Sequence, residues 1–241
     1  MKALILAGGM ATRLRPITHG LPKCLLPIEN DRTIFDIQVD ALRSCGITDI
    51  IVVTGYMAEV IESHAHTHHP DITFTFIFHT HYEKTRAAHG LWAAKDAVAE
   101  PVIYLNSDLL CEPSVIKSVV ENPYETVTAI VQNEWDEEEV NVVLGDGNRI
   151  VEIGKLIEQA RSQGEFIGAT KIAPSFWKRM MDAIKRYDEE GEYQKFAVDS
   201  MQEAIHEGGE LFALDLTGKL ALEIDTIEDY TLAKEVWART I

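Results

Sequence analysis

The first 27 residues constrain the fold of this chain more than any other stretch. A short apolar run, Ala3-Leu4-Ile5-Leu6, has the composition of a buried parallel strand and leads directly into the paired glycines Gly8-Gly9. Because glycine has no Cβ, a loop of this kind lets a phosphate approach the backbone N–H groups closely. The stretch therefore predicts a phosphate-binding loop at the end of the first strand of an α/β sheet.

Basic residues follow the glycines at positions where they can meet a phosphate charge. Arg13 offers a planar fork of N–H donors and Lys23 a point charge, while Pro16 and Pro22 stiffen the loop between them. Neither common phosphate-binding fingerprint fits, because G-x-G-x-x-G is absent and Lys23 follows a proline rather than the glycine of a P-loop. These residues predict a loop that binds a nucleoside triphosphate.

The stretch resembles the signature of the sugar-phosphate nucleotidyltransferase family, G-G-x-x-T-R-L-x-P-x-T followed by P-K-x-L-x-P. The matching residues are Gly8, Gly9, Thr12, Arg13, Leu14, Pro16, Thr18, Pro22, Lys23, Leu25 and Pro27. The nucleotide-binding residues that the resemblance implies are Leu6, Ala7, Gly8, Gly9, Met10, Ala11, Thr12, Arg13, Lys23 and Asp108. A Gly/Pro surface turn with scattered cations is the alternative interpretation of the same letters.

Composition narrows the classes of partner. The net charge of −17 argues against a nucleic-acid-binding surface or a patch for anionic membranes. Anionic substrates must then be met by local cations, which makes the few clustered basic residues informative. We expect a cytoplasmic protein, because the three cysteines indicate reduced, packed thiols and no signal peptide or membrane-spanning run of about 20 apolar residues is evident.

The first ~120 residues alternate between predicted strands and helices, which favours a parallel sheet with right-handed crossovers. The expected strands are Ala3–Leu6, Asp49–Thr54, Thr73–Phe78 and Val102–Leu105, and the expected helices are Thr33–Cys45, Met57–His66 and Ala87–Val98. A bound nucleotide is expected at the carboxyl ends of these strands, beside the opening loop.

In the second half of the chain, the order of predicted elements changes, and several short strands precede the helices. The expected strands are Thr126–Val131, Val140–Leu144, Ile150–Ile153, Phe166–Ile172, Leu211–Leu214 and Leu220–Ile224, the last two closing the same sheet, and the expected helices are Pro174–Tyr187, Phe196–His206 and Ile227–Ala238. Because no linker is visible, we expect one domain, 1–241, with a nucleotide-binding half (1–124) and an acceptor-binding half (125–241). The expected fold is α/β, Rossmann-like and three-layered, with a mixed, mostly parallel central sheet.

Two aspartates stand where each could hold a metal ion. Asp108 follows the apolar strand Val102–Leu105 at the loop side of the sheet, and it is too far from Pro113 to cap the next helix. Asp225 follows Leu222-Glu223-Ile224 and could equally start the last helix as a neighbour of its N-cap. The resemblance implies that both aspartates hold Mg²⁺, since family members carry carboxylates at the matching positions.

The resemblance also implies residues for the acceptor. Lys155 resembles the second phosphate-binding lysine of the family, although two residues separate it from Glu152 and no proline follows. Gly168 matches a glycine where the acceptor approaches the backbone, with a plain strand glycine as the alternative. The implied catalytic residues are thus Arg13, Lys23, Asp108 and Lys155.

The sequence constrains the identity of the nucleotide base and of the acceptor less than it constrains the phosphate-binding residues. The G-T-A loop of typical sugar-nucleotide members is missing, and the short length and the E-I-D-T-x-E-D-Y ending look more like the small cytidylyltransferases. That branch couples CTP to small phosphorylated or phosphonate acceptors such as phosphocholine, phosphoglutamine and aminoethylphosphonate. Two interpretations of Arg86 and His89 are open: either they contact the base or the acceptor, or they only begin a helix. Trp135, beside an acidic run, forms a pocket for a cationic amine or part of a solvated face.

The leading hypothesis is a Mg²⁺-dependent nucleotidyltransferase in which an acceptor oxygen attacks the α-phosphorus of CTP and pyrophosphate leaves. The alternatives are a sugar-1-phosphate uridylyl-, thymidylyl- or guanylyltransferase and a non-catalytic nucleotide-binding module. The histidines between His64 and His81 are expected to be exposed, because no carboxylate or thiol frame for zinc accompanies them.

Overall fold

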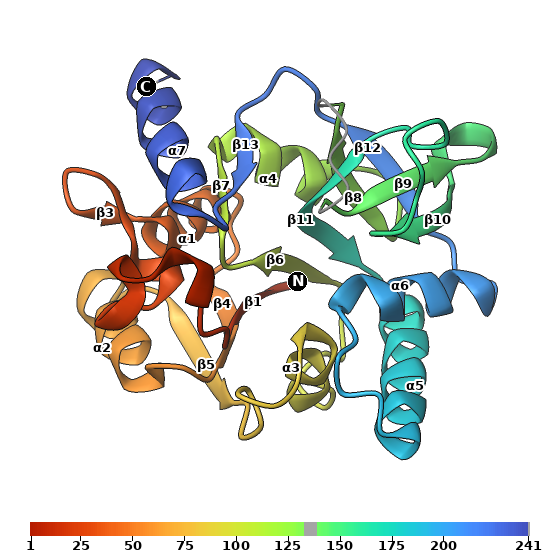
Figure 1. Ribbon diagram of the computed structural model, residues 1–241, viewed down its shortest axis with the longest axis horizontal. Helices are drawn as coiled ribbons and strands as arrows, with labels where there is room; N and C mark the ends of the chain where they lie inside the picture. The colour runs from red at the N-terminus through yellow and green to blue at the C-terminus, as the bar shows by residue number, and fades with distance from the viewer. Residues whose placement is uncertain (133–138, 241) are drawn as a thin grey trace.

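A computed structural model describes residues 1–132 and 139–240 of the chain. Within those residues, nine strands form one sheet, whose main path runs β10-β9-β11-β6-β1-β4-β5 (Figure 1). Strands β6, β1, β4 and β5 are parallel neighbours, with Leu4 of β1 opposite Tyr104 of β6 and Ile51 of β4. The predicted parallel sheet of the first half is confirmed.

The elements follow the expected order. The strands are β1 (Lys2–Ala7), β2 (Pro27–Glu29), β3 (Arg32–Thr33), β4 (Asp49–Thr54), β5 (Thr73–Phe78), β6 (Val102–Asn106), β7 (Leu109–Cys111), β8 (Val127–Val131), β9 (Asn141–Leu144), β10 (Ile150–Gly154), β11 (Glu165–Ile172), β12 (Phe212–Asp215) and β13 (Ala221–Glu223). The helices are α1 (Ile34–Ser44), α2 (Ala58–His68), α3 (Ala87–Ala93), α4 (Pro113–Glu121), α5 (Pro174–Glu190), α6 (Ala197–His206) and α7 (Ile227–Thr240). Over the part of the chain that the structure describes, no helix combines the length and apolar character needed to cross a bilayer.

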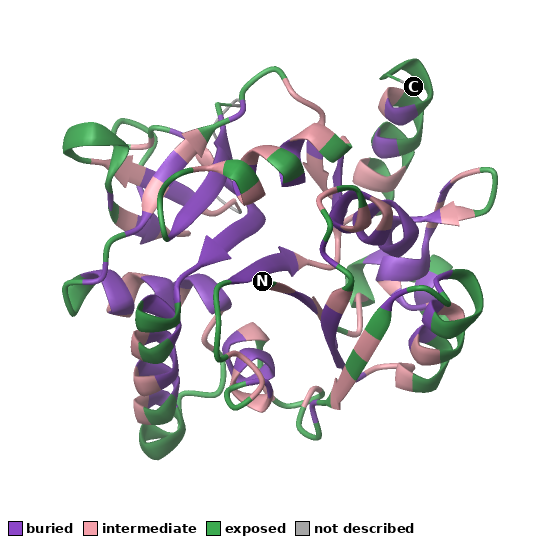
Figure 2. Cartoon of the chain, turned by 180° about the vertical axis from the view of Figure 1, so that it is seen from behind, coloured by how far each residue is buried: buried purple, intermediate pink, exposed green. Residues whose placement is uncertain are grey.

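The central strands are buried nearly throughout, and because successive side chains point to opposite faces, they contribute to a hydrophobic core on each face of the sheet. In β1, Ala3 and Ile5 face a core formed with α1, α2 and α4, whereas Leu4 faces a core formed with α3, α5 and α6. Figure 2 shows the central strands buried and the outer surface of α5 exposed. Helices on both faces of one mixed, mostly parallel sheet make three layers, so the expected fold class is confirmed.

Strand β11 joins the two halves of the chain. It pairs antiparallel with β6, with Ala169 opposite Leu105, and its other edge pairs with β8. Strand β12 then adds to β8 in parallel. The second half therefore extends the sheet begun by the first half, and the loops of both halves meet at one edge.

One strand expectation is wrong. The segment Leu220–Ile224 does not close the main sheet; its strand β13 pairs antiparallel with β7 in a separate two-stranded sheet, with Glu223 opposite Leu109. The sequence did not reveal β7 because it is short and follows β6 after only a two-residue turn. The Ile224 N–H donates to the Asp108 carbonyl at 3.2 Å, so this pairing brings Asp225 next to Asp108.

The helix expected over Ala87–Val98 is also shorter than the pattern indicated. Helix α3 ends at Ala93, and the chain continues in turns in which the N–H groups of Lys95 and Ala97 donate to carbonyls three residues earlier. Hydrogen bonds between residues three apart wind the backbone more tightly than in an α-helix. The apolar spacing alone therefore predicted too long a helix.

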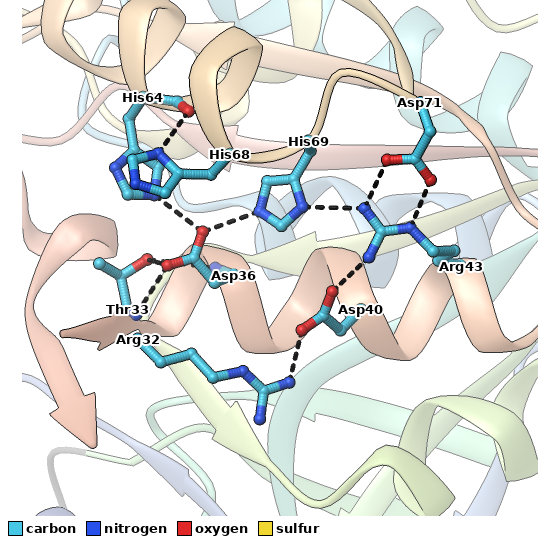
Figure 3. A network of polar contacts seen from close by, with 9 residues as sticks. All are labelled: Arg32, Thr33, Asp36, Asp40, Arg43, His64, His68, His69 and Asp71. Carbon is cyan, nitrogen blue, oxygen red and sulfur yellow. Dashed lines mark hydrogen bonds and ion pairs between the residues drawn. The ribbon is translucent and has the colours of Figure 1, made fainter. Parts of the chain in front are cut away.

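The histidine cluster is exposed only in part: His66, His68 and His81 are exposed as expected, but the other three are not. His69 and His79 are buried, and His64 and His69 each contact the same carboxylate oxygen of Asp36, at 2.8 Å and 2.7 Å (Figure 3). Asp36 also accepts from the backbone N–H and hydroxyl of Thr33, both at 2.8 Å, in the capping box of α1. The carboxylate that accompanies these histidines belongs to Asp36, which lies 28 residues before His64 and 33 residues before His69 in the sequence.

The same contacts fix how these groups are protonated. Arg43 lies 3.0 Å from His69 Nδ1, and because a guanidinium only donates, Nδ1 accepts and Nε2 carries the proton toward Asp36. Burial opposes ionisation of Asp36, but the hydrogen bonds from His64, His69 and Thr33 outweigh it and hold the pKa of the carboxyl well below its usual range. The network ties α1 to α2 and to the turn before β5.

We predict that Asp36→Asn destabilises the fold by about 2 kcal/mol at pH 7, because an amide nitrogen then faces buried donors. The native pKa of Asp36 is depressed, so its contribution is complete above the unfolded value of about 3.9 and is lost as the pH falls below it. Urea unfolding of wild type and variant at neutral and acidic pH measures this difference. Asp40→Asn, on the same helix but in surface ion pairs, is the control and should cost no more than about 1 kcal/mol. A difference for Asp36→Asn that stays constant with pH would contradict the account.

Candidate active site

A cavity of about 530 Å³ opens at the edge of the sheet where the loops of both halves meet. One wall is the opening loop, whose lining residues are Leu6, Ala7, Gly8, Gly9, Met10, Ala11, Thr12 and Arg13. The floor carries Asn106 and Asp108 at the end of β6, and the opposite wall carries Lys155 and Phe196. The cavity lies at the carboxyl ends of β1 and β6, the expected position for a ligand in a sheet of this type.

The opening loop is held by its own short contacts. Ala11 adopts a left-handed conformation, with φ of 46°, which is uncommon for a residue other than glycine. Its carbonyl accepts from the Leu14 N–H at 3.2 Å and from the fully buried Thr18 hydroxyl at 2.9 Å. These contacts stabilise the unusual conformation and shape the wall in front of Arg13.

Lys23 connects three distant parts of the chain. Its ammonium group lies 2.7 Å from Asp108 and 2.5 Å from Asp225, and Arg13 lies 2.6 Å from the other oxygen of Asp225. The Lys23 side chain is only 12% exposed, so its own ion pairs are largely shielded from solvent, whereas Arg13 is 54% exposed. The structure thus brings together four residues that the sequence placed in one site.

Electrostatics keep this cluster charged. Burial by itself lowers the pKa of Lys23, but the charges of Asp108 and Asp225 outweigh it and hold the pKa above its ordinary value. Burial opposes ionisation of Asp225, yet Lys23 and then Arg13 lower the pKa of that carboxyl. The cations and the carboxylates therefore stabilise one another's charged forms.

Asp225 lies next to the capping residue of α7, as the alternative interpretation had it, but its carboxylate contacts Lys23 and Arg13 instead of the helix. Thr226 precedes α7, and its hydroxyl accepts from the Asp229 N–H at 3.1 Å. The Asp229 carboxylate in turn accepts from the N–H groups of Thr226 and Asp225, at 2.7 Å and 3.0 Å. This reciprocal arrangement caps the helix and leaves the Asp225 side chain directed at Lys23 and Arg13.

Glu223 is a cavity residue that the sequence analysis missed. It accepts from Asn106 Nδ2 at 2.7 Å, and the Tyr104 hydroxyl donates to the oxygen of the same amide. Burial, with the neighbouring charge of Asp108, raises the pKa of Glu223 well above its usual value. A carboxylate two residues before Asp225 within an apolar strand was the available signal, because acids are rarely buried without a function.

Gly168 lies beneath this carboxylate. It has φ of 69°, and a Cβ at this position would lie 2.7 Å from both Asn106 and Glu223. The glycine therefore lets β11 pass directly under the cavity floor, so the alternative of a plain strand glycine is wrong.

Two further cations lie on the far wall. Lys155 Nζ is 5.2 Å and the Arg86 guanidinium carbon 4.7 Å from the ring centroid of Phe196, which precedes α6. Both cations line the same cavity as Lys23, so a ligand between the walls faces positive charge from two sides.

Three expected contact residues are not among the described residues that line the cavity, and one of them is Gly168, which lies beneath its floor. His89 is buried behind the cavity wall, with its ring 5.4 Å from that of Tyr193 and 3.9 Å from Asp188, and burial lowers the pKa of its imidazole. Trp135 lies outside the described residues. Among residues 1–132 and 139–240 there is also no group of three or more His, Cys, Asp or Glu side chains arranged to hold a metal ion.

Comparison with known proteins identifies the family. The sequence profile described as nucleotidyl transferase matches residues 2–237. The chain belongs to the nucleotidyl transferase family. The resemblance read from the opening loop is thereby confirmed, and the protein is a nucleotidyltransferase.

Full-length relatives indicate the branch. The chain is 26% identical to a CTP:phosphoglutamine cytidylyltransferase from Campylobacter jejuni, over 95% of this chain and 97% of that protein. It is 25% identical to a choline-phosphate cytidylyltransferase from Streptococcus pneumoniae, over 98% of each. The solved structure of an inositol-1-phosphate CTP transferase from T. maritima covers 98% of this chain and 95% of its own length, with a TM-score of 0.80 and 20% identity, and supports the same fold.

We predict that Gly168→Ala perturbs this nucleotidyltransferase more than Gly147→Ala does. Both glycines have positive φ, 69° and 64°, but a Cβ on Gly147 meets nothing within 4 Å. Gly147→Ala isolates the conformational cost, about 1 kcal/mol, whereas Gly168→Ala adds a clash of roughly another 1–3 kcal/mol. Urea unfolding compares the two variants, and equal losses of stability would show that the cavity floor does not require a glycine.

Proposed function

We propose that this nucleotidyltransferase is a Mg²⁺-dependent cytidylyltransferase that couples CTP to a small phosphate or phosphonate acceptor and releases pyrophosphate. The observation that carries the proposal is the cluster of Lys23, Arg13, Asp108 and Asp225, which faces Lys155 across one cavity. The names of the two full-length relatives favour CTP over other nucleotides.

The opening loop binds the triphosphate in this proposal. Backbone groups of residues 6–12 line the cavity beside Arg13 and Lys23, which neutralise the phosphate charge. Because the chain as a whole is acidic, with a net charge of −17, these local cations determine where a triphosphate binds.

Lys155 orients the acceptor phosphate on the opposite wall. An acceptor phosphate or phosphonate oxygen is already anionic, so attack on the α-phosphorus requires no strong general base. Catalysis then rests on holding the nucleophile in line with the leaving pyrophosphate and on neutralising charge. The placement of cations on both walls meets both needs.

The residues present fit a Mg²⁺ ion. Among the described residues, Asp108 Oδ1 is buried without a hydrogen-bond partner, and Lys23 shows that a cation is accepted between the two carboxylates. Asp108 and Asp225 would hold the ion, with water and phosphate oxygens as its other ligands. When bound, Mg²⁺ supplies additional charge neutralisation at the phosphates.

The same proposal assigns a function to each half of the chain. We propose that residues 1–241 act as a single domain in which 1–124 bind the nucleotide and 125–241 bind the acceptor. Gly168 and His89 then act indirectly, through the cavity floor and through the packing of α3. The free thiols of Cys24, Cys45 and Cys111 agree with activity in the cytoplasm.

We predict pyrophosphate release when the protein is incubated with Mg²⁺, CTP and a small phosphorylated acceptor, and much less with UTP, dTTP, GTP or ATP. Asp108→Ala should lower turnover by at least ~100-fold, because it removes a proposed metal ligand at the reacting phosphates. Its far-UV circular dichroism should remain that of wild type. Asp96→Ala, an exposed aspartate in the turn after α3, is the matched control and should retain full turnover.

Two outcomes would overturn the proposal. Near-normal turnover of Asp108→Ala would remove the metal assignment, and turnover confined to UTP, dTTP or GTP with a sugar 1-phosphate would replace the donor and the acceptor class.

A further inference from the structure

Among the described residues, Lys84 and Arg86 are the cavity cations that the proposed reaction leaves without a role, and Arg86 has side-chain contacts that fix its position. It precedes α3, and its guanidinium stacks over the face of Phe196 with its carbon 4.7 Å from the ring centroid. Lys155 contacts the same ring at 5.2 Å, so the two charges are separated by no more than about 10 Å. A small ligand can therefore reach both cations at once.

The orientation of Arg86 is fixed by neighbouring groups. Its Nε donates to the side-chain oxygen of Gln194 at 3.2 Å, and Gln194 Nε2 donates to the carbonyl of Lys84 at 2.9 Å. The backbone N–H of Arg86 donates to the Tyr193 carbonyl at 3.0 Å. Stacking on one face and a hydrogen bond at Nε direct the two terminal nitrogens of the fork away from these contacts.

The charge of Arg86 lacks the compensation that the other wall provides. Arg13 and Lys23 have carboxylate partners, whereas within residues 1–132 and 139–240 no acidic side chain comes within 4.0 Å of the Arg86 guanidinium. In a chain with a net charge of −17, an exposed arginine that lines a cavity and has no acidic partner among the described residues is suited to an anionic ligand that arrives from solvent.

Which anion it binds follows from what the other cations do. Under the proposed function, the triphosphate lies against the loop with Arg13 and Lys23, and the acceptor phosphate lies against Lys155. Arg86 then faces the part of the acceptor beyond its phosphate. A planar fork matches both carboxylates and phosphates, and because the phosphates are already assigned to other cations, a carboxylate is the anion left for Arg86 to bind through two parallel hydrogen bonds.

We propose that Arg86, supported by Phe196 and Gln194, is a specificity-determining residue that binds a carboxylate of the acceptor. The acceptor class is a small phosphate monoester or phosphonate that carries a carboxylate. This inference rests on the proposed function, because it takes Lys155 as the site of the acceptor phosphate. It assigns Arg86 to the acceptor rather than to the base of the nucleotide.

The test compares ligands that differ only near a carboxylate. O-phospho-L-serine and O-phosphoethanolamine form one pair, and 3-phosphoglycerate and glycerol 3-phosphate form a second. Isothermal titration calorimetry of the full chain, saturated with a non-hydrolysable CTP analogue and Mg²⁺, gives the affinity of each ligand. In at least one pair, wild type should bind the carboxylate-bearing member ~10- to 100-fold more tightly.

Variants assign that preference to Arg86. Arg86→Gln should abolish the preference and leave the affinity for the CTP analogue unchanged, and Arg86→Lys should restore it in part because charge returns without the fork. Phe196→Leu should weaken carboxylate binding while the Phe196 N–H still donates to Asp199 and starts α6. Arg239→Gln, at an exposed position on α7, is the matched control and should bind like wild type.

The outcomes separate this inference from the proposed function. Equal affinity within both pairs, failure to bind either carboxylate-bearing ligand, or a loss of CTP-analogue binding in Arg86→Gln would overturn the role of Arg86. Pyrophosphate release with acceptors lacking a carboxylate would leave the proposed function standing in that case. Carboxylate-dependent binding without pyrophosphate release from any nucleotide would instead confirm the anion site and refute the proposed reaction.

Discussion

The contact of Lys23 with Asp108 and Asp225 is the interaction on which the site depends. It joins residues 85 and 202 positions apart in the chain, and it places two carboxylates and two cations at one point of the cavity. A buried lysine alone would lose its charge, and two aspartates alone would repel each other. Because each charge offsets the others, the cluster keeps its charges although Lys23 is largely buried.

The strand topology brings these groups together at one edge of the sheet. The parallel strands β1 and β6 end at the same edge of the sheet, so the opening loop and Asp108 are neighbours. The small sheet of β7 and β13 then carries Asp225 and Glu223 back to that edge from the end of the chain. Strand β11, with Gly168 beneath the floor, pairs with β6 and links the second half of the chain to the same framework. Residues of both halves thus line the cavity.

Local pattern in the sequence was enough to predict the central sheet and the loop residues Arg13 and Lys23, because strand alternation and a loop motif depend on neighbours along the chain. Asp108 and Asp225 were predicted to share one site only through the family resemblance, since their residue types alone left Asp225 open. The partners of His64 and His69, the pairing of β13 with β7, and the end of α3 depend on contacts across the fold, so spacing could not reveal them. The same reason explains why Glu223 and Phe196 were missed. Their position in the cavity follows from pairing and packing, whereas their sequence neighbourhoods look like an ordinary strand and an ordinary helix start.

The central claim is that the two walls of the cavity bring a nucleotide's α-phosphorus and an acceptor phosphate together for transfer. The most direct measurement uses CTP labelled at its α-phosphorus, Mg²⁺ and a panel of small phosphorylated acceptors, and follows where the label goes. The account predicts that the label moves into a CDP-linked product in amounts equal to the pyrophosphate released, and that this transfer disappears in Lys23→Met. Label that remains in CTP with every acceptor, or that appears only as CMP through hydrolysis, would contradict it.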